Sequence, residues 1–282
     1  QYGGQGLPFL IHPAAAEMWN SACTSMALCP MLTAGGIDAL AAHGSDELKD
    51  KYLPNLITGK WTATMNLTEP HAGSDLSTLK TTAEPVGDHY LIRGQKIYIT
   101  WGEHDMTDNI VHIVLAPMTD APPGNKGLSL FLVPKFLVNE DGSLGERNDV
   151  RVMSTEHKLG IHASPTCVMG FGENGGAIGY LIGEPGDGLA CMFTLMNHAR
   201  LEVGLQGVAL SERAYQDALG YAKERVQGRD AETGEASAII HHADVQRMLM
   251  CMKSLTEAMR GLTYDGAFAH DFRIHGKDED EK

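Results

Sequence analysis

The middle of the chain is a succession of short stretches rich in β-forming residues with no helical segment between them, and this pattern constrains the fold most. Turn residues separate the stretches, for example Gly87-Asp88 and the run Pro122-Pro123-Gly124. Evenly spaced short strands bounded by turns are typical of an antiparallel barrel or sandwich. The expected strands are residues 82–86, 90–93, 96–100, 109–116, 127–133, 150–153, 166–171 and 177–182.

Helical patterns flank this β region on both sides. Residues 14–60 are rich in Ala, Met and Leu, with a helix end predicted at His43-Gly44 and a new N-cap at Ser45. Leu53-Pro54 is expected to end or bend that second helix.

A helical period returns after Gly188 and is expected to continue to about Gln227, before a loop at residues 228–235. Apolar residues at helical spacing over residues 245–262 then predict a second amphipathic helix whose methionines fill a core.

These patterns together predict an α+β protein. We expect the end of an N-terminal helical domain at residues 1–62, a middle β domain at residues 63–184, and the start of a C-terminal helical bundle at residues 185–282. The chain begins with Gln1 rather than Met, so we expect it to be a piece of a longer protein.

Composition limits the class of partner. A formal net charge of −14 argues against nucleic acid or an anionic membrane, because both need a basic face. No uninterrupted apolar run approaches the roughly 18 residues of a membrane span, so no membrane association is expected. The five cysteines include no C-x-x-C pair, which argues against a disulfide framework or a zinc site. A reduced, cytoplasmic location is the expectation.

Residues 65–75, with the sequence Met-Asn-Leu-Thr-Glu-Pro-His-Ala-Gly-Ser-Asp, form the most informative stretch. An extended run ends at Thr68, and Pro70 removes a backbone donor and restricts the residue before it. Gly73 allows a positive φ angle in the loop that follows. Such a loop can present N–H groups and the hydroxyls of Thr68 and Ser74 to a flat polar ligand, although a strand followed by an ordinary turn gives the same pattern.

A second stretch, residues 94–102, has the sequence Gly-Gln-Lys-Ile-Tyr-Ile-Thr-Trp-Gly. Together the two stretches resemble the acyl-CoA dehydrogenase family, in which a T-E-P-x-A-G-S-D loop is followed by K-x-W-I-T-x-G. The resemblance continues through residues 158–166, 183–188 and 196–200 and ends near 224–228, so it covers most of the chain in the family's order. The motifs match the long bacterial branch of the family best.

The resemblance implies an FAD cofactor, whose flavin N5 accepts the hydride that leaves the substrate. Thr100 matches the family's threonine that donates a hydrogen bond near N5, where charge accumulates. Tyr98 stands where the family usually has tryptophan, and its aromatic ring can still stack on the flavin. The other implied cofactor-binding residues are Met65, Leu67 and Thr68 at the pyrimidine edge, Ser74 near the pyrophosphate, and Gly73 and Ile99 within the same motifs.

By the same resemblance the substrate is an acyl-CoA thioester. Ser74 also matches a position near the CoA arm, and Asn197 and Arg200 match a pair that lines the pantetheine and adenosine, although the family often has aspartate at the first. Arg225 and Gln227 match residues that contact the adenosine half of FAD from a neighbouring subunit. We therefore expect a homo-oligomer, either a dimer or a tetramer. The guanidinium of Arg225 suits the FAD pyrophosphate because it can donate two parallel hydrogen bonds and is always charged.

Dehydrogenation between Cα and Cβ needs a carboxylate base for the α proton. In most of the family this glutamate lies in the C-terminal helical domain, past the point that Lys282 matches, and in a minority it takes the position of Ala199. Glu202, three residues further on, should point elsewhere. We expect no catalytic base in this segment, and we expect residues 1–282 alone to bind FAD weakly and to lack dehydrogenase activity.

Two other patterns have plainer explanations. Gly170-Phe-Gly-Glu-Asn-Gly175 matches G-x-G-x-x-G, but the strand expected at residues 177–182 follows it where a dinucleotide fingerprint needs a helix, so we expect a hairpin loop. His241, His242 and Asp244 form the densest histidine cluster but lack a spaced third partner. We expect no metal site there, and we expect Asp244 to cap the next helix.

The predicted function is an FAD-dependent acyl-CoA dehydrogenase that forms trans-2-enoyl-CoA and passes electrons to an electron-transfer flavoprotein. An acyl-CoA oxidase, which gives its electrons to oxygen, is an alternative with the same fold. A non-catalytic, DNA-associated flavoprotein relative is a second alternative, and the net charge of −14 disfavours it. Scattered pocket residues leave the acyl chain length open.

Overall fold

The computed structural model describes residues 2–230 and 232–276. The described residues divide into two compact units, one formed by residues 25–199 with Tyr2 and the other by residues 3–24 with 200–230 and 232–276. The division falls close to Cys23, whose φ of −160° and ψ of 90° break helix α1 (Ile11–His43). It also falls within the long helix α3 (Gly188–Glu224).

The N-terminal helices of the first unit follow the sequence signals closely. Helix α1 ends at His43, as predicted, and α2 (Asp46–Ile57) begins after Ser45, whose side chain accepts a hydrogen bond from the Leu48 amide. Pro54 lies inside α2, which continues to Ile57. The helix therefore does not end at this proline.

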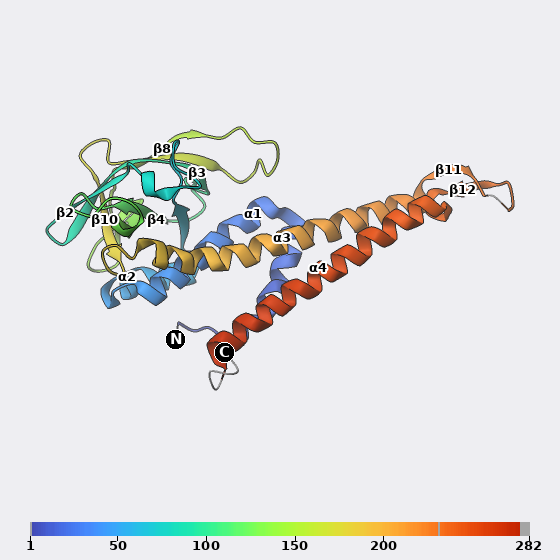
Figure 1. The fold of residues 1–282 in the computed structure, drawn as a ribbon, viewed down its shortest axis with the longest axis horizontal. Helices are drawn as coiled ribbons and strands as arrows, with labels where there is room; N and C mark the ends of the chain where they lie inside the picture. The colour runs from blue at the N-terminus through green and yellow to red at the C-terminus, as the bar shows by residue number, and fades with distance from the viewer. Residues whose placement is uncertain (1, 231, 277–282) are drawn as a thin grey trace. The chain divides into compact units, whose positions relative to one another are not determined.

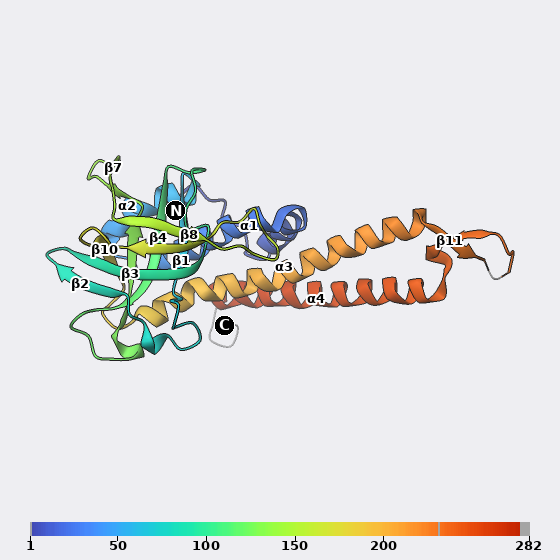
Figure 2. The same ribbon diagram turned by 90° about the horizontal axis from the view of Figure 1, so that it is seen from above.

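One curled sheet forms the body of the first unit (Figures 1 and 2). The strands follow the order β1-β4-β5-β10-β3-β9-β8, and β2 pairs with β3. All the predicted strands are present, with residues 90–93 and 96–100 joined in one long strand. The bounds are β1 (Trp61–Asn66), β2 (Thr82–Val86), β3 (His89–Thr100), β4 (Asn109–Pro117), β5 (Leu128–Pro134), β8 (Val150–Thr155), β9 (Thr166–Phe171) and β10 (Ala177–Ile182), with a separate small pair β6 (Phe136–Val138) and β7 (Leu144–Arg147).

Strand β1 departs from the expected antiparallel pattern. It pairs with β4 in parallel, in the register Trp61 with Asn109 through Asn66 with Val114. A parallel pair needs a long crossover, and residues 67–108 provide it. Sequence spacing alone treats consecutive short strands as hairpins, which explains why the antiparallel expectation was wrong at this pair.

Two apolar clusters lie on opposite faces of the sheet because side chains alternate along each strand. In β5, Leu130 and Leu132 pack in the cluster that includes α1, α2 and the start of α3, whereas Phe131 and Val133 pack in the cluster inside the curl. The sheet is thus buried on both faces at this strand. This double burial explains why β5 reads as an almost continuous apolar run.

The second unit contains an antiparallel helical pair formed by α3 and α4 (Ala243–His275), joined through the hairpin β11 (Val226–Arg229) and β12 (Ala236–Ala238) (Figures 1 and 2). Helix α3 ends at Glu224, three residues before the predicted end at Gln227. Of the predicted loop at 228–235, residues 228–229 belong to strand β11 and the rest form the turn of this hairpin, apart from Ala231, which lies outside the described residues.

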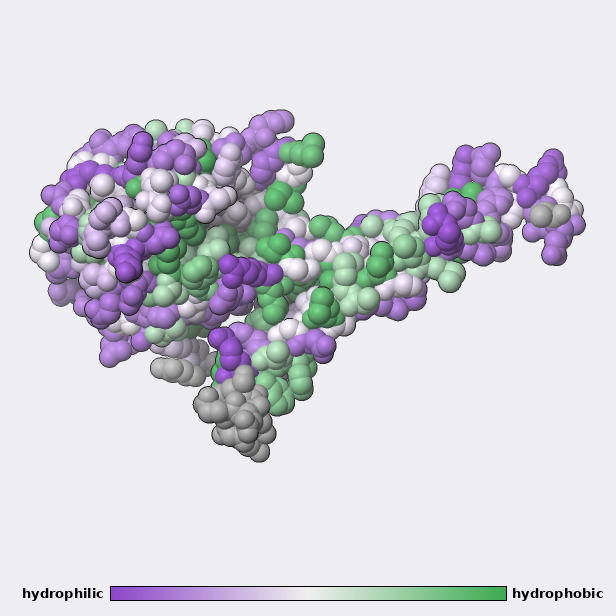
Figure 3. Space-filling model, viewed as in Figure 1, coloured by the Kyte–Doolittle hydropathy of each residue, from purple (hydrophilic) through white to green (hydrophobic). Residues whose placement is uncertain are grey.

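Helix α4 does not bury the stripe predicted for it. Leu249, Thr256 and Ala267 are its buried residues, and hydrophobic residues remain on its surface (Figure 3). Core packing of the methionines was therefore the wrong expectation for most of the stripe within the described residues. The exposed members of the stripe are Met248, Leu255, Met259 and Leu262.

The start of α4 also differs from its prediction. His242 is the N-cap residue and makes no side-chain cap, and Asp244 lies one step inside the first turn. The Asp244 carboxylate accepts a 2.9 Å hydrogen bond from Arg247 instead. Asp244 still lies where a helix start favours negative charge.

Helix α1 is long and apolar enough to pass a test for a membrane span by length and composition. The sequence analysis found no apolar run of this length, so this result was not expected. However, 56% of the window is buried inside the protein, and the break at Cys23 and the proline at Pro30 interrupt the helix. These features are those of a core helix.

Candidate functional site

The loop after β1 lies directly against strand β3. Glu69 and Ala72 exchange two backbone hydrogen bonds of 2.8 and 3.0 Å, which close the loop into a tight turn. The Ile97 amide then donates a 2.9 Å hydrogen bond to the Thr68 carbonyl. The two sequence stretches that carry the motifs are therefore brought together in the first unit.

A buried ion pair joins the same two segments. The Lys96 ammonium lies 2.9 Å from Glu69 Oε1, and the two side chains are 0% and 3% exposed. Lys96 Nζ also donates to the Leu67 carbonyl at 2.9 Å. The Glu69 carboxylate accepts two further bonds from the backbone amides of Lys80 and Thr81, at 2.7 and 3.0 Å.

The charges of this pair are stabilised by each other. Burial lowers the pKa of Lys96 to about 8, against the opposing effect of Glu69. Burial alone would raise the pKa of Glu69, but the Lys96 charge and the hydrogen bonds hold it below its ordinary value. Both groups are therefore charged at neutral pH.

Strand β3 contains a β-bulge immediately after Lys96. Lys96 pairs with Met169 and Ile99 with Cys167, so β3 has one residue more than β9 over this interval. Tyr98 occupies the bulge with a left-handed φ of 61° and a ring that is 61% exposed. Such a conformation is strained for an aromatic residue and is often found at binding sites.

Three predicted hydroxyls near this bulge are available to a ligand. Thr68 and Thr100 are half-buried and Ser74 is exposed, and no hydroxyl of the three bonds to another described residue. Strand β1 is an edge strand, since β4 is its sole partner among the described strands, and its Ala63 amide donates a 3.1 Å hydrogen bond to Thr33 Oγ1 of α1. The backbone of Met65 and Leu67 lies on or next to this strand.

Gly73 does not use the positive φ angle that a glycine in this loop was expected to allow. Its φ is not among the positive values, and a Cβ at this position would meet the Thr68 methyl at an ordinary 3.6 Å. Neither backbone conformation nor space therefore demands glycine here. Its proposed role toward a cofactor remains a prediction.

Trp101 anchors the end of β3 and was not singled out by sequence reasoning. Its amide donates to Pro165 O at 2.7 Å, and its indole Nε1 donates to Ser25 O at 3.0 Å. The ring packs with Leu28 and Leu32 of α1. The signal available in the sequence is the tryptophan that directly follows Thr100.

The remaining predicted site residues divide between the units. Asn197 is exposed at the end of the first unit, and Arg200 is exposed at the start of the α3 part of the second. In the second unit, Arg225 Nη2 donates a 3.1 Å hydrogen bond to Gln227 Oε1, with both residues exposed.

Glu202 is buried in the second unit and forms a hydrogen-bonded ion pair with His12. This side chain is consequently engaged within its own unit. The expectation that it points away from the position of a base stays a prediction.

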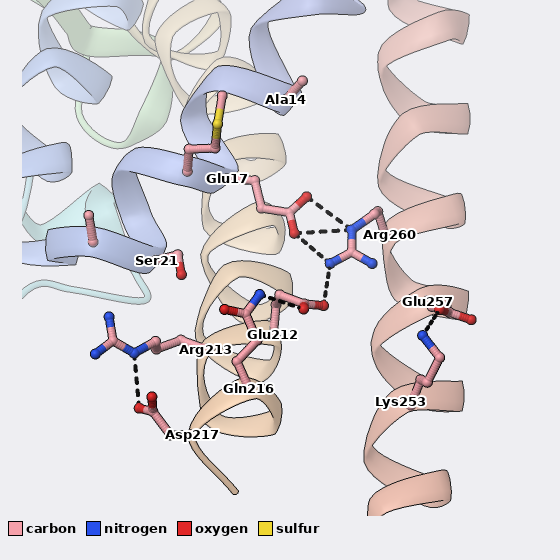
Figure 4. Close-up of a pocket in the computed structure, with 12 residues that line it drawn as sticks. Ala14, Glu17, Ser21, Glu212, Arg213, Gln216, Asp217, Lys253, Glu257 and Arg260 are labelled. Atoms are coloured by element: carbon pink, nitrogen blue, oxygen red, sulfur yellow. Dashed lines mark hydrogen bonds and ion pairs between the residues drawn. The ribbon is translucent and has the colours of Figure 1, made fainter. Parts of the chain in front are cut away.

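The second unit also has a polar cavity of about 720 Å³ between α1, α3 and α4 (Figure 4). Arg260 projects between two carboxylates there, at 2.7 Å from both Glu17 and Glu212. The neighbouring charges also pair, as Lys253 with Glu257 and Arg213 with Asp217. Since these charged side chains pair with one another, we interpret the ion pairs of Arg260 as a clamp that holds the three helices together.

Comparison with known proteins identifies the family. Three family models match consecutive parts of the chain: the acyl-CoA dehydrogenase N-terminal domain over residues 1–60, the middle domain over 64–173 and the C-terminal domain over 186–279. The chain belongs to the acyl-CoA dehydrogenase family. The middle-domain match contains the bulged strand and the loop of the candidate site.

Curated and solved relatives agree with this family assignment. The chain is 53% identical to 3-methylmercaptopropionyl-CoA dehydrogenase of Ruegeria pomeroyi over 99% of its own length and 47% of the relative. The butyryl-CoA dehydrogenase structure from Megasphaera elsdenii has a TM-score of 0.78 at 28% identity, with 96% of this chain and 66% of that chain covered. A structure of PigA with FAD and proline has a TM-score of 0.77 at 29% identity, covering 96% and 66%.

The chain spans about half the length of the first curated relatives it matches. Within this member of the acyl-CoA dehydrogenase family, the motif residues assembled in the first unit were predicted from sequence. The ion pair that holds them together was not singled out. Its signal in the sequence is that Glu69 is the acid of the T-E-P motif and Lys96 is the base of the K-x-W-I-T motif.

Proposed function

We propose that the protein is an FAD-dependent acyl-CoA dehydrogenase, which oxidises an acyl-CoA thioester between Cα and Cβ to a trans-2-enoyl-CoA. Family membership supports the reaction class. The names of its relatives support a thioester of coenzyme A as the substrate. The structure of PigA with FAD supports the cofactor.

The single observation that carries the proposal is the bulge of β3 beside the loop that follows the edge strand β1. It leaves the Tyr98 ring exposed, and it lies in the segment where the Thr68 and Thr100 hydroxyls have no partner among the described residues. An aromatic face, hydroxyl donors and the backbone of a loop beside them are the groups that a flat, polar isoalloxazine ring needs. The residues present therefore fit FAD, which supplies a hydride acceptor when bound.

Each residue has a proposed role at this site. Thr100 donates a hydrogen bond to the flavin near N5, and Tyr98 stacks on the ring. Ile99 is buried behind them and fixes the strand. Thr68 and the backbone of Met65 and Leu67 bind the pyrimidine edge, and Gly73 and Ser74 approach the pyrophosphate.

Residues outside the bulge complete the proposal. Ser74, Asn197 and Arg200 bind the CoA arm of the substrate, and Arg225 with Gln227 binds the adenosine half of FAD in a neighbouring subunit of a homo-oligomer. The base that removes the α proton is supplied from outside residues 1–282. Two residues support this placement. Ala199 has no carboxyl group to act as a base, and the Glu202 carboxyl group is hydrogen-bonded to His12.

The experiment is an anaerobic titration of the purified full-length protein. We expect the protein to carry bound flavin with a visible absorption band. This band should bleach on addition of 3-methylmercaptopropionyl-CoA, butyryl-CoA or another acyl-CoA of a chain-length panel. Reoxidation should be fast with an electron-transfer flavoprotein and slow with oxygen. Rapid peroxide formation would instead identify an oxidase, and flavin that no acyl-CoA bleaches would contradict the proposal.

A further inference from the structure

We infer that Lys96 and Glu69 act together as positioning residues of the flavin site. The pair fixes the loop that carries Thr68 against the strand that carries Tyr98 and Thr100. Both side chains are almost completely inaccessible, so neither contacts the cofactor. This inference rests on the proposed function.

The number of segments that meet at the pair is the first argument. Lys96 on β3 reaches Glu69 and the Leu67 carbonyl, and Glu69 in turn accepts the amides of Lys80 and Thr81. Three separate stretches of chain are thereby fixed to one another by directed bonds. Because hydrogen bonds to charged groups are short and strongly directional, the pair sets register as well as distance.

The location of the pair relative to the bulge is the second argument. Lys96 is the last regularly paired residue before the extra residue in β3, and the next residue, Ile97, donates its amide to Thr68 O. Tyr98 follows directly in its left-handed conformation. Two fixed residues, Lys96 and Ile97, therefore lead directly into the strained Tyr98, and a strained conformation persists only where the surroundings over-determine it.

Stability alone does not account for a buried pair at this point. Apolar residues of similar volume often stabilise a fold as well as a buried ion pair does, since desolvation offsets the attraction between the charges. An apolar contact would, however, leave the backbone bond from Ile97 to Thr68 O as the remaining directed contact between the loop and β3 within the described residues. The property that the pair adds is a single conformation of the loop, which matters where a ligand must meet several groups at once.

The test compares three variants of the full-length protein as apoproteins titrated with FAD. The double variant Lys96→Met with Glu69→Gln removes both buried charges, so no lone charge remains in the core. Glu69→Gln alone keeps the shape of the side chain. Arg93→Met is the matched control, because Arg93 lies on β3 as Lys96 does and its ion pair with Glu84 of β2 is exposed.

We expect the double variant to melt near the parent but to bind FAD about ten-fold or more weakly, because a loop that holds the binding conformation a tenth of the time weakens apparent affinity by that factor. At saturating FAD, its flavin absorption bands should differ from those of the parent, a change that lost stability alone does not produce. Arg93→Met should keep both the affinity and the spectrum.

Each outcome decides one question. A folded double variant with the parent's affinity and spectrum would overturn the inference. If the double variant does not fold, Glu69→Gln decides: weaker FAD binding with an altered spectrum supports the inference, and unchanged binding overturns it. A parent protein that binds no FAD would instead contradict the proposed function, before any variant is compared.

Discussion

The indole Nε1 of Trp101 donates a 3.0 Å hydrogen bond to the backbone carbonyl of Ser25, which ties the end of strand β3 to helix α1. Trp101 is buried and has a left-handed φ of 54°. The bond therefore holds a strained residue directly after Thr100. The end of the bulged strand is fixed to the helical layer as well as to its neighbouring strand.

Trp101→Phe should lower the free energy of unfolding by about 1–2 kcal/mol, because the aromatic ring is kept while the Ser25 carbonyl loses its indole donor. Chemical denaturation of the protein measures this change. Trp19→Phe is the matched control, since Trp19 is exposed. Equal losses in the two variants would show that the Ser25 bond contributes nothing.

Thr100→Ala should slow flavin reduction by acyl-CoA on the order of ten-fold or more, because one hydrogen-bond donor to the developing charge is removed. Stopped-flow measurement with fully loaded flavin separates this effect from cofactor loss. Thr100→Ser keeps the hydroxyl and should retain most of the rate. A reduction rate that survives in the alanine variant would exclude Thr100 from the site.

Arg225→Ala should lower the flavin content of the purified protein, because the proposed role of Arg225 is to bind FAD of a neighbouring subunit. The ratio of flavin to protein absorbance gives the occupancy, and size-exclusion chromatography gives the oligomeric state. Arg213→Ala changes an exposed arginine on α3 and serves as the control. A monomer with stoichiometric FAD would refute this role.

Acid should destabilise the fold through His112. Burial lowers the pKa of His112 from 6.5 to about 3, and Thr64 Oγ1 lies 2.8 Å from its Nδ1. As the pH falls below 6.5, His112 therefore binds a proton in the unfolded chain but stays neutral in the folded protein. The free energy of unfolding consequently decreases as the pH falls through this window, by about 1–2 kcal/mol between pH 6.5 and pH 5.

The variant His112→Asn should lose this part of the pH dependence. Unfolding free energies measured from pH 7 to pH 5 should then fall less steeply in the variant than in the parent. Parallel profiles for the two proteins would contradict the assignment to His112.

Arg260→Lys should loosen the helical clamp of the second unit, because an ammonium lacks the planar fork that meets Glu17 and Glu212 together. The side chains are partly exposed, so the expected loss is only about 1 kcal/mol. Hydrogen exchange of amides in residues 11–22 should increase. The same exchange in Arg247→Lys, which alters the exposed pair with Asp244, should stay unchanged.

Local signals in the sequence predicted much of the fold. Strand positions followed from alternation and turn residues, and Ser45 was recognised as a helix cap because capping depends on the next few residues only. Thr68 and Thr100 were also named in advance, and the structure brings the stretches around them together.

Features that depend on distant partners were missed. Regular alternation would place Lys96, Tyr98 and Thr100 on one face of the strand, but the bulge buries Lys96 and exposes Tyr98. The bulge exists only relative to β9, which lies far along the chain. The parallel pairing of β1 with β4 and the exposed stripe of α4 depend in the same way on tertiary contacts that no local pattern encodes.

The left-handed backbone at Tyr98 sets two selective pressures against each other at one position. Glycine or asparagine would adopt this φ with less strain, and the relief would amount to about 1 kcal/mol. Neither residue offers an aromatic face. Selection for heat resistance alone should therefore replace Tyr98, whereas selection for turnover should keep it. A library randomised at position 98 should yield different residues under the two selections.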